Sequence, residues 1–162
     1  KCTPLVVPLF CRQHHHKEVH AMNASTPLVQ TSWQQVLPIR EVAAELFYAK
    51  LFELDPSLRT LFRGDMKEQG RKLMSMIGVA VMHLDRPEAL VPTLKALGAR
   101  HSGYGVKNHH SDTVAAALID TLQRGLGEAF TPEVKAAWVD VYGVLAGTMK
   151  AAAATPSGQV TK

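Results

Sequence analysis

Apolar residues recur at three- and four-residue steps along most of the chain beyond residue 24. This spacing places apolar side chains on one face of a helix, so it predicts amphipathic helices. The stretch from Pro38 to Phe52 is one example, with Ile39, Val42 and Leu46 in register. The same steps occur in four later stretches, which are Met66 to Leu84, Pro87 to His101, Ser111 to Leu126 and Pro132 to Ala153.

Capping residues, prolines and glycines mark where these helices start and stop. Asp85 followed by Glu88 resembles a capping box. Gly125 and Gly127 predict the end of a helix, because glycine readily takes the backbone conformation found there. Three further starts combine a capping side chain with a proline at the first helical position, and these are Thr26-Pro27, Asp55-Pro56 and Thr131-Pro132.

Signals for β-structure are absent from the sequence. No stretch alternates strictly between apolar and polar residues, and neither Asn-Gly nor Asp-Gly occurs to form a tight hairpin turn. The pattern therefore predicts an all-α domain of about six to eight helices joined by short loops. That number is larger than a four-helix bundle requires.

The composition is that of one globular domain. With 162 residues, 46% apolar and 20% charged, the chain can bury one core and is not typical of a disordered protein. Its apolar runs fall far short of the roughly 18 residues that span a bilayer, so we expect no membrane span. The net charge is only +4, and residues 1–21 carry +2 of it. The remaining +2 gives little support to nucleic acid as a partner.

Residues 1–24 differ from the rest and are interpreted as an N-terminal extension, either disordered or added upstream of a natural start at Met22. Residues 25–153 are the expected domain, and residues 154–162 are a C-terminal tail. The domain lacks cysteine, which suits a reducing cytoplasm. In the extension, a disulfide would need an oxidising compartment, and the ligand spacing fits no standard zinc pattern. Its cysteines and histidines are Cys2, Cys11, His14, His15, His16 and His20.

Two residues within the apolar pattern are candidates for chemistry. His101 ends a helical stretch just before the Gly103-Tyr104-Gly105 break, where a lone histidine is more often structural than a ligand. Tyr48 has apolar neighbours along its helix, and a buried tyrosine usually directs its hydroxyl at a polar partner. That partner is either a group inside a pocket or a backbone carbonyl.

A third candidate is a mixed helix face formed by Gln69, Lys72, Leu73 and Met76, at steps of three and four residues. The simpler interpretation of this face is an amphipathic helix whose polar edge meets solvent.

The common catalytic motifs of hydrolases and nucleotide-binding enzymes are missing from the sequence. The expected domain has no cysteine, which excludes a thiol nucleophile there. His109 and His110 are adjacent, but neighbours on a helix point about 100° apart, so we do not expect them to share a metal.

Five stretches, in order, resemble the globin family over roughly residues 25–152, and most closely the bacterial single-domain globins, the globin part of flavohaemoglobins and neuroglobin. This resemblance implies a globin fold that encloses a pocket for haem b (iron protoporphyrin IX). The stretches are LFYAKLFELDP at 46–56, LF at 61–62, QGRKLM at 69–74, LGARHSGYGV at 97–106, and a last segment with AFTP at 129–132, AW at 137–138 and YG at 142–143.

On the proximal side, the resemblance makes His101 the histidine that ligates the haem iron. Phe62 matches the phenylalanine that packs on the haem face. The resemblance also implies that Tyr104 and Val106, which follow His101, contact the cofactor. Flavohaemoglobins flank this histidine with a tyrosine and a glutamate, whose aligned positions here hold His110 and Ala153. The resemblance therefore leaves the electron-donating proximal network incomplete.

On the distal side, Gln69 matches the distal position, Tyr48 the tyrosine over the ligand and Leu73 the apolar residue beside it. Lys72 resembles a residue near the haem propionates. Tyr48 and Gln69 are both hydrogen-bond donors, so the resemblance implies tight binding and slow release of dioxygen. Glutamine is a poor iron ligand, so we expect an open sixth position on the iron rather than a second axial ligand.

The resemblance implies a protein that binds dioxygen reversibly, with carbon monoxide and nitric oxide as further ligands. The alternative is a nitric oxide dioxygenase, for which the chain, ending at Lys162, would need an external reductase. A gas or redox sensor is the third interpretation. For assembly, we expect a monomer or a weak homodimer.

Overall fold

The computed structural model describes residues 24–107 and 109–154. The expected N-terminal extension up to residue 23, with its cysteines and histidines, lies outside the described residues, as does the tail from residue 155 onward.

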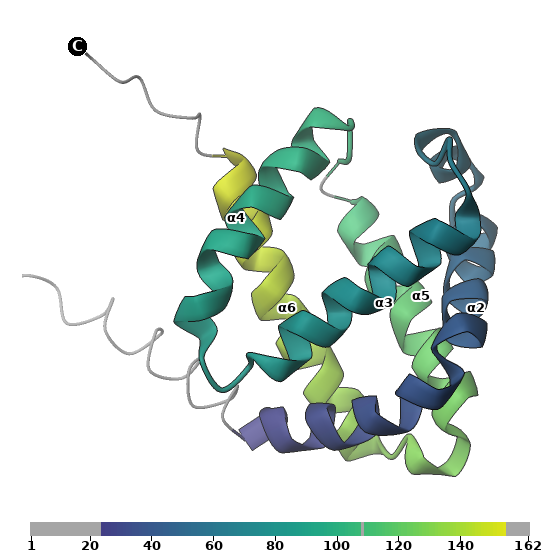
Figure 1. Cartoon of the computed structure of the whole chain (residues 1–162), viewed down its shortest axis with the longest axis vertical. Coiled ribbons are helices and arrows are strands. Elements are labelled where there is room, and N and C mark those ends of the chain that lie inside the picture. The colour runs from purple at the N-terminus through teal and green to yellow at the C-terminus, as the bar shows by residue number, and fades with distance from the viewer. Residues whose placement is uncertain (1–23, 108, 155–162) are drawn as a thin grey trace, which may run out of the picture.

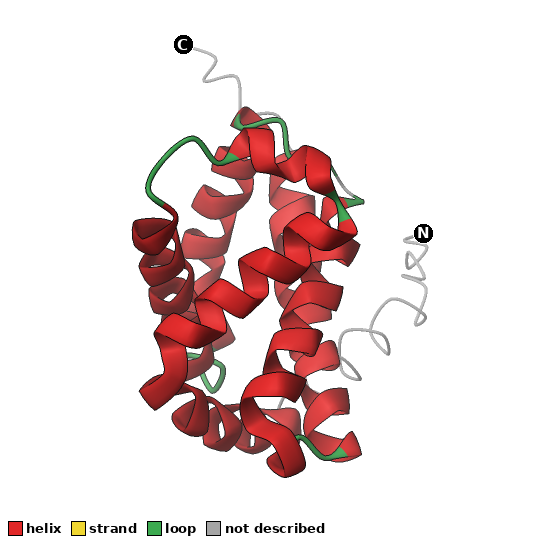
Figure 2. Cartoon of the chain, turned by 90° about the vertical axis from the view of Figure 1, so that its right-hand side faces the viewer, coloured by secondary structure: helices red, strands yellow, loops and turns green. Residues whose placement is uncertain are grey.

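The described chain is helical throughout, and Figure 2 shows helices and connecting loops without a strand in those ranges. The predicted all-α fold is therefore confirmed. Residues 24–36 are helical in the described part of the chain. The long helices after them are α2 (Arg40–Leu54), α3 (Met66–Met82), α4 (Pro87–Gly103), α5 (His110–Leu126) and α6 (Pro132–Ala154). Three short 3-10 helices lie between them, η1 (Leu37–Ile39), η2 (Pro56–Leu61) and η3 (Gly127–Ala129).

Two helix pairs form the body of the molecule. In Figure 1, α4 lies against α6 on one side and α2 lies against α5 on the other, while α3 crosses between the pairs. Because the pairs stand apart at the level of α3, the packing leaves an interior space bounded by α3, α4, α5 and α6. The packing of the helices therefore creates the space for a binding site, whichever polar residues line it.

Two of the predicted helix starts agree with the structure. Asp55 accepts a hydrogen bond from the Ser57 amide at the start of η2, and Thr131 accepts one from the Val134 amide at the start of α6. Asp65 caps α3 in the same way, by accepting from the Lys67 amide. These bonds satisfy amide groups that a helix start otherwise leaves unpaired.

Two predicted starts are wrong. Arg86, not Asp85, precedes the first residue of α4, because the residue before Pro87 is disfavoured in the helical conformation. Thr26 lies inside the helical residues 24–36 rather than at their start.

A glycine allows the crossing of α2 and α3. A Cβ placed on Gly70 would lie 2.9 Å from the Cβ of Ala44, which is closer than side chains normally approach. The two backbones meet here because both residues are small. This crossing fixes where α3, and therefore Gln69 and Leu73, sits relative to Tyr48 on α2.

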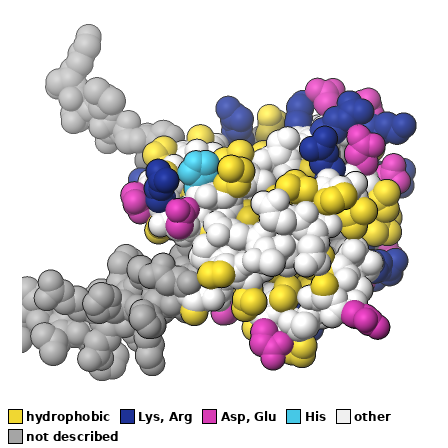
Figure 3. Space-filling view, turned by 60° about the horizontal axis from the view of Figure 1, so that its bottom comes forward, with side chains coloured by type: hydrophobic (Ala, Val, Ile, Leu, Met, Phe, Trp, Pro, Cys, Tyr) yellow, Lys and Arg dark blue, Asp and Glu magenta, His cyan; other side chains and the backbone are white. Residues whose placement is uncertain are grey.

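The surface mixes residue types. On the face drawn in Figure 3, hydrophobic side chains are scattered between charged and polar ones. Within the described part of the chain, no helix has both the length and the apolar character needed to cross a membrane.

Candidate functional site

An apolar cavity of about 920 Å³ lies between α3, α4, α5 and α6. Its volume is near the upper end of the range of roughly 300–1,000 Å³ typical of ligand and cofactor sites. Each of the four helices contributes aliphatic side chains to the wall, among them Leu73, Ile77, Leu94, Leu97, Val114, Leu118, Val141 and Leu145. A cavity of this kind suits a large, mostly apolar ligand.

His101 is the imidazole that α4 brings to the cavity wall. It is half-buried in the last turn of the helix, and its Nδ1 lies 2.7 Å from the carbonyl oxygen of Leu97. A carbonyl oxygen can only accept, so Nδ1 carries the proton and donates. In the neutral ring the lone pair is then on Nε2, the nitrogen with which a histidine of this tautomer binds a metal.

Close packing of α4 on α6 sets the position of His101. A Cβ on Gly98, one turn before His101, would lie 2.5 Å from the backbone oxygen of Met149. After the helix, the Val106 amide donates to the carbonyl oxygen of His101, which turns the chain back toward the cavity. Val106 itself lines the cavity.

Tyr48 lies in an aromatic cluster beside the cavity. Its ring contacts Phe47, Phe52 and Phe62, at centroid distances of 5.2, 5.9 and 5.3 Å. Burial raises the pKa of Tyr48 to about 12, so its hydroxyl stays protonated at neutral pH. The hydroxyl donates to the backbone carbonyl oxygen of Gln69 at 3.5 Å, the outer limit of a hydrogen bond.

The three predicted residues of α3 have different surroundings. Leu73 lies on the cavity wall. Gln69 is half-buried. Its side-chain amide nitrogen lies 3.9 Å from the position that a Cβ would take on Gly64. Lys72 is exposed and pairs with Glu68 at 3.1 Å.

The structure thus brings the predicted site residues together in two groups. Leu73, His101 and Val106 line the cavity. Tyr48, Phe62 and Gln69 do not line it; Tyr48 contacts Phe62 and the backbone of Gln69, and it reaches the cavity through Phe47, which lines the wall. Tyr104 stands apart, with 70% of its surface exposed beyond the end of α4.

The cavity wall also includes residues that were not singled out from the sequence. Met149 lines it from α6, and Phe47 lines it from α2. Tyr142 lines it as well, and its hydroxyl donates to the Ser111 carbonyl oxygen at 2.8 Å. The step from Val141 to Leu145 and Met149 is a regular four-residue stripe, so periodicity on α6 could have identified this wall.

His110 also lies on the cavity wall, at the first residue of α5. It is buried, and its Nδ1 accepts a hydrogen bond from the Lys107 amide at 3.0 Å. The resemblance to flavohaemoglobins also singled out Ala153. Its side chain lies outside the described residues.

Comparison with known proteins gives a family match over most of the domain. The family model described as Globin matches residues 45–149. Neuroglobin of Danio rerio is 32% identical, over 75% of this chain and 86% of its own length. Neuroglobin of Tetraodon nigroviridis is 31% identical with the same coverage.

Solved structures agree in fold. An engineered carbene transferase, made from a candidate nitric oxide dioxygenase of Rhodothermus marinus, superposes with a TM-score of 0.73 at 26% identity. The match covers 80% of this chain and 91% of that chain. A hexacoordinated haem protein from an anhydrobiotic tardigrade has a TM-score of 0.74, covering 82% of this chain and 94% of its own. At 19% identity, that likeness concerns the fold alone.

Proposed function

The chain belongs to the globin family, and we propose that it holds haem b in the cavity between α3, α4, α5 and α6 and binds dioxygen there reversibly. In this proposal His101 would hold the iron through Nε2. Tyr48 and Gln69 would supply hydrogen-bond donors to a bound gas.

The cavity fits such a cofactor. Its wall is mainly aliphatic, as the apolar ring system of a porphyrin requires, and it presents one imidazole on the side formed by α4. A bound haem would supply an iron that binds diatomic gases. The residues of this chain would set where hydrogen-bond donors lie around that iron.

The residues of the chain have two tasks in this proposal. The Leu97 carbonyl holds the proton on Nδ1 of His101, so that Nε2 keeps a lone pair for the metal and the ring stays oriented. Tyr48 supplies a hydroxyl that does not ionise at neutral pH, since burial has raised its pKa to about 12. Its 3.5 Å bond to the Gln69 carbonyl is weak, so the hydroxyl can turn toward a better acceptor.

The single observation that carries the proposal is the position of His101 on the wall of the apolar cavity. His83 on the surface makes an equivalent bond from Nδ1 to the Val79 carbonyl oxygen at 2.8 Å, but it is exposed. The local bond is therefore common to both histidines, and what distinguishes His101 is its place in the cavity. His83 is for this reason a matched control.

The proposal is tested by absorption spectra of the purified protein, reduced with dithionite, before and after carbon monoxide. We expect a Soret band that shifts with carbon monoxide, is lost in His101→Gly and is partly restored by added imidazole. The control His83→Gly should keep the wild-type spectrum. A pyridine haemochrome spectrum identifies the haem type. Absence of a Soret band after haemin is added, or an unchanged spectrum in His101→Gly, would overturn the proposal.

Nitric oxide dioxygenation is a second candidate, favoured by the likeness to an engineered protein made from a candidate enzyme of that kind. It would need an electron donor after each turnover. Repeated consumption of nitric oxide in the presence of a reductase would favour this function, and a single stoichiometric turnover would favour reversible oxygen binding.

A further inference from the structure

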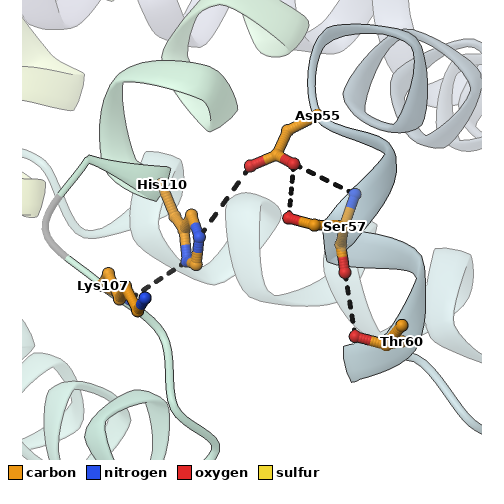
Figure 4. A network of polar contacts seen from close by, with 5 residues as sticks. All are labelled: Asp55, Ser57, Thr60, Lys107 and His110. Carbon is orange, nitrogen blue, oxygen red and sulfur yellow. Dashed lines mark hydrogen bonds and ion pairs between the residues drawn. The ribbon is translucent and has the colours of Figure 1, made fainter.

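Asp55, His109 and His110 form a cluster of potential metal ligands that is separate from His101. One ligand atom from each residue lies within 4.8 Å of the other two. Asp55 precedes η2, while His109 and His110 stand at the start of α5, so the cluster joins segments far apart in the sequence. Figure 4 shows Asp55 and His110 facing each other.

The sequence argument against sharing a metal assumed that both histidines lie within one helix. In the structure His109 is the cap residue directly before α5, and although its backbone is helical its ring still reaches that of His110. The two rings are in contact, with centroids 4.3 Å apart. His109 is exposed, so its side chain can rotate toward Asp55 without disturbing the core.

Asp55 and His110 each place a possible ligand atom near the other. Asp55 uses Oδ1 to accept from the amide and hydroxyl of Ser57, and its Oδ2 lies 3.9 Å from Nε2 of His110. Nδ1 of His110 accepts a hydrogen bond from the Lys107 amide, so the ring is neutral, as a metal ligand must be.

We propose that Asp55, His109 and His110 bind one zinc ion between the start of η2 and the start of α5. Two imidazoles and one carboxylate form a ligand set typical of zinc, with water in the fourth position. Tetrahedral zinc with bonds near 2.0–2.1 Å separates its ligand atoms by roughly 3.4 Å. The cluster therefore closes by about an ångström when zinc binds, and the exposed His109 can make most of that movement.

Zinc binding would also change the contact between His110 and Lys107. Nδ1 of His110 now accepts from the Lys107 amide, so the proton of the neutral ring is on Nε2. Zinc on Nε2 moves that proton to Nδ1, and the Lys107 amide then loses its acceptor. Since Val106, Lys107 and His110 itself line the cavity, zinc at this site acts directly on the cavity wall.

A zinc titration must separate this site from the N-terminal segment, whose cysteines and histidines are also zinc ligands. The experiment therefore uses the full chain with six residues changed to serine. These are Cys2, Cys11, His14, His15, His16 and His20. Zinc chloride is titrated into this variant by isothermal calorimetry, which reports uptake whether or not haem is bound. Failure of the zinc site is thus distinguishable from failure of the proposed haem function.

We expect one zinc ion per chain in the six-serine variant, with affinity reduced at least tenfold by either His109→Gln or Asp55→Asn in that background. His109 is exposed, and asparagine can keep the cap on Ser57, so both variants should fold, which circular dichroism checks. The control His83→Gln should bind zinc like its parent. No zinc uptake by the six-serine variant, or equal affinity in its His109→Gln derivative, would overturn the proposal.

Discussion

His101 donates a hydrogen bond of 2.7 Å from Nδ1 to the carbonyl oxygen of Leu97, one helical turn earlier. The bond fixes both the tautomer and the orientation of the ring. Because Leu97 and His101 both line the cavity, a bond within α4 determines which nitrogen a cofactor would meet.

The hydroxyl of Tyr48 should control oxygen release more strongly than the amide of Gln69. Tyr48 is buried and protonated, and its present bond is weak, whereas the amide nitrogen of Gln69 lies near Gly64. Charge-assisted hydrogen bonds contribute about 1.5–3 kcal/mol, so Tyr48→Phe should speed oxygen dissociation by about tenfold to a hundredfold. Stopped-flow displacement of oxygen by carbon monoxide measures the rate.

Gln69→Leu should have a smaller effect on that rate. Tyr142→Phe is the matched control, because this tyrosine also lines the cavity but its hydroxyl is engaged with the Ser111 carbonyl. Equal rates in the Tyr48 and Gln69 variants, or a rate unchanged by Tyr48→Phe, would reject the ranking.

Gly70→Ala should destabilise the protein by about 1–3 kcal/mol, since the new Cβ would overlap the Cβ of Ala44 where α2 and α3 cross. The free energy of unfolding is measured by urea titration. Gly143→Ala in α6 is the control, because nothing lies within 4 Å of its Cβ position. There, alanine should stabilise the helix by roughly 0.5–1 kcal/mol. A Gly70 variant as stable as the wild type would contradict the crossing geometry.

Gly98→Ala should be more damaging than Gly70→Ala. Its Cβ would meet the backbone of Met149 at 2.5 Å, and a backbone atom cannot rotate away as a side chain can. We expect α4 to shift from α6 and His101 with it, so the variant should lose about 3 kcal/mol of stability and release haem faster. Transfer of haem to an excess of apomyoglobin measures the release. Gly147→Ala, with open space at its Cβ, should release haem at the wild-type rate.

Burial of His110 should make the protein less stable in mild acid. Its pKa lies below the ordinary value of 6.5, so the unfolded chain binds a proton more readily than the folded one. The stability that neutral His110 contributes is complete above pH 6.5. It is lost as the pH falls through the pKa of His110 in the folded protein, at no more than about 1.4 kcal/mol per pH unit. The pKa of Asp55 is also lowered, so its contribution is lost only in stronger acid.

Urea titrations between pH 7.5 and 5.5, with a chelator present, check this pH dependence. His110→Gln removes the titrating group and can still accept from the Lys107 amide, so its stability should vary less with pH than that of the wild type. His83→Gln is the control, because His83 is exposed and lies outside the cluster around His110. An identical pH dependence in His110→Gln and the wild type would contradict the assignment.

The sequence predicted the helices well, because their signals are local. Apolar periodicity located α2 to α6, and the caps at Asp55 and Thr131 depend on atoms only two or three residues away. The cap at Asp85 was wrong because the proline two residues later excluded the helical conformation at Arg86, a competing local rule.

The resemblance of five stretches to the globin family also identified the family and put forward His101 as a candidate ligand. It could not establish that Tyr48 bonds to the Gln69 carbonyl, that Tyr104 stands in solvent or that Asp55 faces His110. Those relationships join residues on different helices, or depend on where a helix ends. They are decided by how closely the helices approach, at Gly70 on Ala44 and at Gly98 on Met149, and a one-dimensional pattern carries no such distance.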